Sequence, residues 1–229
     1  MRIMITGGGT GGHVFPAVSV IEELGRRDPN LAVQWIGKAK SMEERVAARL
    51  GIPFRPISVI GWPRRRGPRQ LWALLVLLRG ITQALFCLWS FRPDAVFSVG
   101  GYVSLPLALA AEYLGIKVFI HEQNRRLGMA NRILSKHAYR ILLSFPDTLE
   151  NDLAEKSVLT GNPIRSAFLN APSQSEAKKI FELDPDLPVV LVVGGSQGAT
   201  RINQAVADVL TKMRPREAQF LWMTGTKDA

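Results

Sequence analysis

A hydrophobic strand that runs into a glycine loop and then into a helix occurs twice in this chain, at residues 2–24 and 188–210. The first copy reads RIMITGGGTGGHVFPAVSVIEEL, and the second reads PVVLVVGGSQGATRINQAVADVL. A loop of this kind leaves backbone N–H groups unpaired, and the positive end of the helix dipole adds to them. Each copy therefore predicts an anion site at a helix N-terminus. Two copies predict two nucleotide-fold domains around a shared cleft.

Strands and helices alternate along the rest of the chain, which predicts an α/β fold with a parallel sheet. The predicted strands are residues 3–6, 31–36, 54–60, 95–99, 117–120, 140–144, 157–160, 189–193 and 219–224. The predicted helices are 13–25, 41–50, 71–91, 106–114, 129–138 and 200–213.

The polar segment 170–188 leads into a second domain, and we place the domain boundary between residues 165 and 166. Domain 1–165 has enough strands and helices for a complete sheet with both faces covered. Domain 166–229 has only one strand–helix–strand unit, which cannot bury both faces of a sheet. We therefore expect an incomplete second domain, and a chain that is a fragment, a truncated product or half of a split protein.

The net charge of +10 is concentrated in one region. Residues 45–93 contain nine arginines and no acidic residue, and they surround one apolar helix. A basic protein often binds nucleic acid, but this distribution favours another partner, and we expect no nucleic acid. The single cysteine, Cys87, excludes an internal disulfide and is typical of a reducing compartment.

The apolar helix 71–91 is long enough to span a membrane and has one charge, Arg79. An arginine at mid-helix costs about 2.5–3.5 kcal/mol on insertion scales, and strands of one sheet flank the segment. We therefore predict a helix that lies in the interface of an anionic membrane, with an ordinary core helix as the alternative. The predicted membrane residues are Arg64, Arg65, Arg66, Arg69, Trp72, Leu75 and Arg79.

The first glycine loop, residues 7–12, matches the G-x-G-x-x-G pattern of dinucleotide-binding proteins. That pattern also requires an acidic residue after the second strand, where this chain has Gly37-Lys38-Ala39-Lys40. Lysines suit a 2′-phosphate, so an NADP-dependent oxidoreductase remains an alternative. His13 stands at the helix start, where the dipole disfavours the imidazolium and leaves a ring able to accept a proton. The alternative for His13 is a capping role.

Five motifs occur in the order and spacing of the MurG family of bacterial glycosyltransferases, which the chain resembles over its whole length. They are GGGTGGHVFPA (7–17), GGYVSLP (100–106), HEQN (121–124), GNPIR (161–165) and GGSQGA (194–199). The resemblance implies a GT-B fold: a complete N-terminal Rossmann-like domain that binds acceptor and membrane, and here the beginning of a second, UDP-sugar-binding one.

The resemblance also implies an activity. The family transfers N-acetylglucosamine from UDP-GlcNAc to lipid I, with inversion, and forms lipid II for peptidoglycan. It uses no cofactor or metal, because glycine loops and helix ends hold the diphosphate. It is a peripheral enzyme of the cytoplasmic face of the inner membrane and serves cell-wall biogenesis, cell shape and cell division. A module of another class, which binds lipid I or the membrane without catalysis, remains an alternative.

Site residues follow from the motif positions. The implied catalytic residues are His13 and Glu122, and the implied donor-binding residues are Thr10, Gly11, Gly12, Asn124, Arg165 and Ser196. The implied acceptor or diphosphate-binding residues are Gly9, Gly100, Gly101 and Tyr102. Structural alternatives remain open for four of these. They are an Asx-turn for Asn124, a salt bridge to Arg125 or Arg126 for Glu122, simple packing for Tyr102, and a surface arginine without a role for Arg165.

Overall fold

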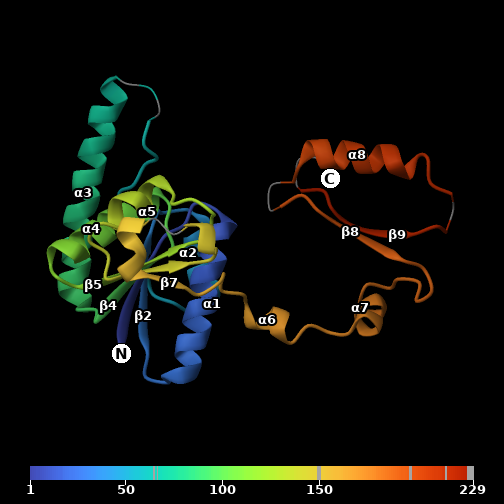
Figure 1. The fold of residues 1–229 in the computed structure, drawn as a ribbon, viewed down its shortest axis with the longest axis horizontal. Coiled ribbons are helices and arrows are strands. Elements are labelled where there is room, and N and C mark those ends of the chain that lie inside the picture. The colour runs from blue at the N-terminus through green and yellow to red at the C-terminus, as the bar shows by residue number, and fades with distance from the viewer. Residues whose placement is uncertain (64, 66, 149–150, 196–197, 215, 226–229) are drawn as a thin grey trace. The chain divides into compact units, whose positions relative to one another are not determined.

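The computed structural model describes residues 1–229 except 64, 66, 149–150, 196–197, 215 and 226–229 (Figure 1). The chain divides into two compact units, Met1–Leu169 and Asn170–Ala229. The division falls after Leu169 because α6 (Ser166–Leu169) is tied to the first unit: the Ser166 hydroxyl donates to Glu22 at 2.9 Å, and Arg165 stacks on Phe168.

The first unit is built on a seven-stranded parallel sheet with the order β3-β2-β1-β4-β5-β6-β7. The strands are β1 (Arg2–Thr6), β2 (Ala32–Gly37), β3 (Phe54–Pro56), β4 (Ala95–Ser98), β5 (Lys117–Glu122), β6 (Arg140–Leu143) and β7 (Ser157–Leu159). The α/β class and the parallel sheet predicted from the sequence are confirmed.

The α-helices of the first unit, besides α6, are α1 (Gly11–Arg27), α2 (Met42–Arg49), α3 (Pro68–Phe91), α4 (Leu105–Tyr113) and α5 (Met129–Leu134). The described residues of this unit also contain 3₁₀ turns at Tyr102–Ser104, Pro146–Thr148 and Asn151–Lys156. Figure 1 shows the helices around the central sheet.

Alternate residues of β1 point into two separate apolar cores. Ile3 and Ile5 pack with Val14 and Val18 of α1, whereas Met4 packs with Leu107 of α4 on the other face. This is the period-2 alternation of a strand that is buried on both faces. The sheet is therefore the middle layer of a three-layer sandwich, and its strand ends are rigidly placed.

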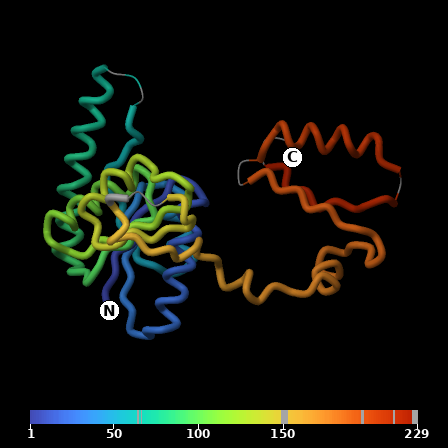
Figure 2. Tube along the Cα trace, viewed as in Figure 1, coloured from blue at the N-terminus to red at the C-terminus, as the bar shows by residue number. Residues whose placement is uncertain are grey.

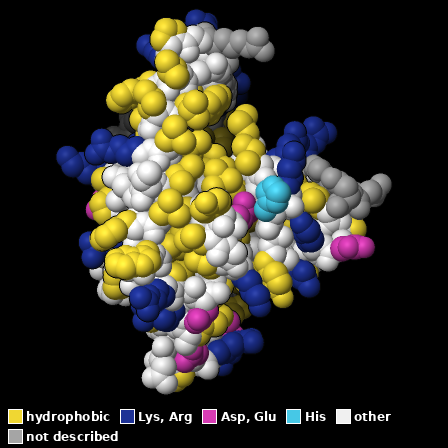
Figure 3. Space-filling model, turned by 90° about the vertical axis from the view of Figure 1, so that its left-hand side faces the viewer, with side chains coloured by type: hydrophobic (Ala, Val, Ile, Leu, Met, Phe, Trp, Pro, Cys, Tyr) yellow, Lys and Arg dark blue, Asp and Glu magenta, His cyan; other side chains and the backbone are white. Residues whose placement is uncertain are grey.

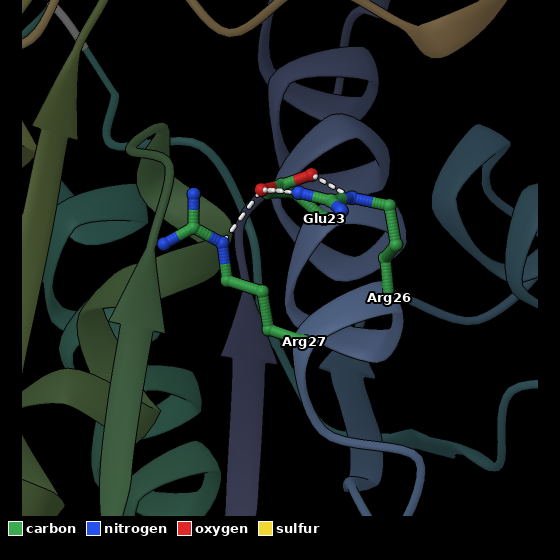
Figure 4. A network of polar contacts seen from close by, with 3 residues as sticks. All are labelled: Glu23, Arg26 and Arg27. Carbon is green, nitrogen blue, oxygen red and sulfur yellow. Dashed lines mark hydrogen bonds and ion pairs between the residues drawn. The ribbon is translucent and has the colours of Figure 1, made fainter.

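An ion-pair cluster lies at the carboxyl end of α1, at the opposite end from the glycine loop. The Glu23 carboxylate accepts hydrogen bonds from Arg26 and Arg27 (Figure 4), and these bonds lower the pKa of Glu23 to about 2. The two arginines also suit the negative end of the helix dipole. The cluster is solvent-exposed and far from the predicted site along the helix.

Helix α3 connects β3 to β4 and projects beyond the rest of the first unit (Figure 1). One narrow stripe of small and apolar residues is buried: Ala73, Gly80, Ala84 and Leu88. The segment before the helix runs back along it (Figure 2), and Ser58 N donates to Gln83 at 2.7 Å. Gly80 permits this approach, because a Cβ there would lie 2.4 Å from Ser58 O.

By length and hydropathy, α3 qualifies as a candidate membrane span. The strands before and after it, β3 and β4, belong to the same parallel sheet, so the chain leaves one folded unit before α3 and returns to it after α3. A helix in that position crosses from one strand of the sheet to another and does not separate two sides of a bilayer.

The sequence-based bounds agree with the structure to within a few residues, with two exceptions. The strand predicted at 54–60 ends at Pro56, because the chain leaves the sheet there and packs Ile57 and Val59 into the core beside α3. The helix predicted at 129–138 ends at Leu134, where Ser135 takes the C-cap position.

The second unit contains a parallel pair of strands, β8 (Val189–Val193) and β9 (Gln219–Met223), joined by α8 (Thr200–Leu210). Helix α7 (Gln174–Ile180) precedes them and begins with a capping box between Ser173 and Glu176. The strand residues Leu191 and Val193 are exposed in this unit. The predicted strand–helix–strand unit is therefore formed, with sheet surface uncovered among the described residues.

Candidate functional site

The predicted site lies at the point where the order of the strands in the sheet reverses, between β1 and β4. From β1 the chain moves outward through β2 to β3, and α3 then returns it to β4 on the other side of β1. The loops after β1 and β4 therefore diverge at the carboxyl ends of two adjacent strands. In open parallel sheets this switch point is where ligands bind.

The two glycine loops at this point are in direct backbone contact. A Cβ on Gly7 would lie 2.9 Å from the carbonyl oxygen of Gly100, and a Cβ on Gly101 would lie 3.0 Å from that of Gly8. Gly7, Gly100 and Gly101 also have positive φ angles, 125°, 83° and 79°. Glycine is required here both for the backbone conformation and for the close approach.

Helix α1 begins in the middle of this cluster. Thr10 is its N-cap residue, but the threonine hydroxyl makes no capping hydrogen bond. Gly11 and Gly12 follow at the first two helical positions, where N–H groups have no helical carbonyl to bond, whereas His13 N donates to Thr10 O at 3.1 Å. The helix therefore presents free donors and the positive end of its dipole, the arrangement that binds phosphate groups.

A buried carboxylate that the sequence analysis did not identify packs against the glycine loop 7–12. Glu43 of α2 is fully buried and accepts hydrogen bonds from Gly9 N and Lys38 N, both at 3.3 Å. A Cβ on Gly8 would lie 2.3 Å from the Glu43 carboxyl carbon, so glycine is needed there as well. Glu43 thus connects the glycine loop to the end of β2.

His13 lies in the first turn of α1, and one side of its ring faces two oxygen atoms. Nδ1 lies 2.8 Å from Val99 O and 3.0 Å from Oε1 of Gln123. The other side faces Gly101: a Cβ there would lie 3.8 Å from Nε2 of His13. The imidazole is therefore held through Nδ1 and directs Nε2 toward the Gly100–Gly101 loop. A capping role does not describe these contacts.

Glu122, at the end of β5, is almost completely buried and accepts four hydrogen bonds. Oε1 accepts from Asn124 N at 3.0 Å and from Asn124 Nδ2 at 2.8 Å, and Oε2 accepts from Gly128 N at 2.8 Å and Asn131 Nδ2 at 2.9 Å. The salt-bridge alternative is not formed: within the described part of the chain Glu122 pairs with neither Arg125 nor Arg126, and Arg125 pairs with Asp147. Glu122 organises the loop after β5 and orients the exposed Asn124 amide.

Arg165, which ends the loop after β7, reaches the start of α1. Its guanidinium stacks on Phe15 and Phe168, 4.6 and 5.0 Å from the ring centroids. These residues line an open hollow of about 300 Å³ together with Gly11 and Gly12. A stacked guanidinium keeps its planar N–H donors available, which suits a diphosphate or a carbonyl oxygen.

The structure thus brings most of the predicted site residues of the first unit together at one edge of the sheet. Tyr102 joins them, because a Cβ on Gly9 would lie 3.9 Å from its ring. Ser196 lies outside the described residues. The contacts of His121 and Gln123, like those of Glu43, were not predicted; for the first two, the quoted HEQN motif was the available signal.

The predicted membrane residues form a separate group along α3 and the segment before it. Trp72, Leu75 and Arg79 are exposed and line a groove of about 420 Å³ with Val59 and Ile60. Arg65 and Arg69 are exposed, and Arg64 and Arg66 lie outside the described residues. Figure 3 shows apolar side chains over much of this face, with Lys and Arg side chains around them.

Comparisons with known proteins agree with this geometry. Residues 3–143 match the glycosyltransferase family 28 N-terminal domain, and residues 189–229 match the family 28 C-terminal domain. The chain is 39% identical over 229 residues to a protein of Alkaliphilus oremlandii, and 38% identical over 225 residues to one of Bacillus subtilis. Both are UDP-N-acetylglucosamine–N-acetylmuramyl-(pentapeptide) pyrophosphoryl-undecaprenol N-acetylglucosamine transferases. The alignments cover 99% and 98% of this chain but 62% of each relative.

Solved structures give the same result. The crystal structure of Acinetobacter baumannii MurG superimposes with a TM-score of 0.70 at 30% identity, over 99% of this chain and 59% of that one. A UDP-GlcNAc 2-epimerase of Neisseria meningitidis has a TM-score of 0.64 at 15% identity, over 97% and 72%, and shares the fold. The GT-B-type architecture and the family resemblance are confirmed. The chain belongs to glycosyltransferase family 28.

Proposed function

We propose that this chain forms the acceptor-binding and catalytic part of a transferase that moves N-acetylglucosamine from UDP-GlcNAc to lipid I. The single observation that carries the proposal is the placement of His13 between the two glycine loops, with Nδ1 against Val99 O and Nε2 toward Gly101. The names of the relatives supply the substrates, and the chain spans 62% of their length.

The proposed reaction is one displacement with inversion. The C4 hydroxyl of the acceptor sugar attacks the anomeric carbon of the donor, the bond from that carbon to the UDP oxygen breaks, and UDP leaves as the anion. Nε2 of His13 takes the hydroxyl proton, as a general base must do within hydrogen-bond reach. The N–H groups of the glycine loops and the start of α1 stabilise diphosphate charge without a metal.

The remaining site residues receive roles from their positions. Gly9, Gly100, Gly101 and Tyr102 bind the acceptor diphosphate, and Thr10, Gly11, Gly12, Asn124 and Arg165 contact the donor. Ser196 of the glycine loop 194–199 is a further donor contact by its motif position alone. Glu122 is the less suitable base of the two candidates, because four N–H groups already occupy its oxygens.

We also propose that α3 holds the protein on the cytoplasmic face of an anionic membrane, because the acceptor is a lipid. Leu71, Trp72, Phe86 and Trp89 are all more than 60% exposed, an apolar surface that a protein in water alone does not need. Arginines in and before the helix suit anionic headgroups.

Two alternatives have less support. The family 28 matches do not favour an NADP-dependent oxidoreductase. Glu43 brings a carboxylate to the end of β2, but it is buried and bonded to Gly9 N and Lys38 N, so it is not available to a ribose hydroxyl. A non-catalytic module that binds lipid I or the membrane would not need a histidine whose Nε2 can accept a proton, as His13 offers here.

The test is a transfer assay with radiolabelled UDP-GlcNAc and a soluble lipid I analogue. The chain is assayed alone and joined to the remaining C-terminal part of the Bacillus subtilis relative. We expect weak or absent turnover for the chain alone and lipid II formation by the joined protein. Calorimetry that detects acceptor binding, together with no turnover by the joined protein, would instead support the silent module.

A further inference from the structure

His13 is one end of a hydrogen-bond relay that runs through Gln123 and His121 to Gly161. Nδ1 of His13 faces Oε1 of Gln123 at 3.0 Å, Nε2 of Gln123 faces Nδ1 of His121 at 2.9 Å, and Nε2 of His121 faces Gly161 O at 3.2 Å. This hydrogen-bond relay joins the start of α1 to the ends of β5 and β7.

The orientation of the Gln123 amide is fixed by backbone carbonyl groups, which can only accept hydrogen bonds. Its Nε2 lies 3.2 Å from Val99 O and 3.4 Å from His121 O. The reversed amide would place an oxygen against both carbonyl oxygens. Nε2 is therefore the end that faces them, and Oε1 is the end that faces His13.

The proton positions on the two histidines follow from this orientation. Gln123 donates to Nδ1 of His121, so that nitrogen carries a lone pair and Nε2–H of His121 donates to Gly161 O. Nδ1 of His13 faces two acceptors, Oε1 of Gln123 and Val99 O, so it carries the proton. Nε2 of His13 is then the nitrogen with the lone pair.

Burial maintains the arrangement at the His121 end. His121 is 1% exposed, and burial lowers the pKa of its imidazole, so the ring is neutral in neutral solution. A second proton, on Nδ1 of His121, would face the N–H of Gln123 and break the hydrogen-bond relay.

We propose that Gln123 is a positioning residue for His13, oriented in turn by His121, and that the pair keeps the lone pair of His13 on Nε2. The inference rests on the proposed function for its catalytic meaning. When Nε2 takes the acceptor proton, the new positive charge is shared with Nδ1–H, which already faces two oxygen atoms. Gly161 begins the loop that ends at Arg165, so the same hydrogen-bond relay connects His13 to the predicted donor-binding residue Arg165.

The test is a long-range ¹H–¹⁵N spectrum of the full chain with ¹⁵N-labelled histidine, at roughly pH 8, above the ordinary histidine pKa of about 6.5. We expect opposite tautomers: His13 protonated on Nδ1 and His121 protonated on Nε2. The exposed His137 is the internal reference, and His137→Asn assigns its signals. An Nε2–H tautomer at His13, or the same tautomer at His13 and His121, would overturn the proposal.

Gln123→Glu is the matched variant, because it keeps an oxygen toward His13 and replaces the donor toward His121 with an acceptor. We expect protonation of Nδ1 of His121 in this variant, with the Nδ1–H tautomer of His13 retained. An unchanged His121 pattern would show that the amide does not orient it. These spectra do not depend on turnover, so a failed transfer assay contradicts the proposed function and leaves this inference to its own test.

Discussion

The buried carboxylate of Glu43 accepts the backbone N–H of Gly9 across 34 residues of sequence, and it lies where any side chain on Gly8 would have to be. Helix α2 therefore determines the shape of the loop that receives the diphosphate in the proposed function. Such support keeps backbone donors in position before a ligand arrives, which is the basis of electrostatic preorganisation.

Gly8→Ala should destabilise the first unit by about 1–3 kcal/mol, because the new Cβ overlaps the Glu43 carboxylate. Glu43→Ala in the same chain should recover part of that cost, with a coupling of at least about 0.5 kcal/mol. Urea unfolding measures both. Gly25→Ala is the control, because nothing lies within 4 Å of a Cβ there and alanine stabilises a helix. Additive effects of the two changes would contradict the contact.

Glu122→Gln should cost about 1.5–3 kcal/mol of unfolding free energy, because an amide cannot accept from all four N–H groups that surround the carboxylate. Asp147→Asn, which breaks the exposed pair with Arg125 near the same loop, should cost no more than about 1 kcal/mol. Thermal and urea unfolding check the difference. Equal effects of the two substitutions would mean that Glu122 does not hold the loop.

His13→Ala should lower kcat of the joined transferase by about 10²–10⁴-fold, the usual range for loss of a general base. The folded fraction should change little, because His13 is only half-buried. His137→Ala, at an exposed position, is the control. The measurement is initial-rate formation of labelled lipid II, and a nearly normal kcat would remove His13 from the mechanism.

Replacement of Arg64, Arg65, Arg66 and Arg69 by serine should weaken binding to anionic vesicles at least tenfold, at about 1 kcal/mol per basic residue near the surface. Serine at Arg26, Arg27, Arg49 and Arg214 makes the same change in net charge and should have a smaller effect. Trp72→Ser with Trp89→Ser tests the apolar part separately. Co-sedimentation measures all three, and equal binding by the wild type and the first variant would contradict membrane docking through this segment.

Glu112 should make the stability of the first unit pH-dependent. Burial raises the pKa of its carboxyl from 4.5 to about 7, and Lys156 offsets part of this effect. Below pH 4.5 the folded and unfolded chains both keep the proton. Between pH 4.5 and 7 the unfolded chain loses it more readily, so this contribution to stability falls as the pH rises, and above pH 7 the loss is complete.

Glu112→Gln should therefore stabilise the protein at pH 8 by about 1–2 kcal/mol, after allowance for solvent screening, and have little effect at pH 4. Glu155→Gln, at an exposed carboxyl, should produce no such slope. Urea unfolding across this pH range is the measurement. A difference between wild type and variant that is constant with pH would contradict the assignment.

The sequence by itself determined the order of strands and helices, because hydrophobic period and glycine loops are local signals. It also placed His13, Gly100–Gly101, the HEQN segment and the GNPIR segment at the ends of strands, where a parallel sheet gathers them at one edge. The family resemblance then supplied their roles, since no local pattern states what a loop binds.

Only the tertiary structure decided which side chains support the site. Glu43 reads as an ordinary charged residue at the start of a helix, and its burial beside Gly8 depends on how α2 packs against α1 and β2. The sequence offered Glu122 as a base, but four donors from Asn124, Gly128 and Asn131 surround it in the fold. The tautomer of His13 depends on Val99 O and Gln123 Oε1, which follow β4 and β5, because a proton position is set by the atoms opposite and not by the residue that carries it.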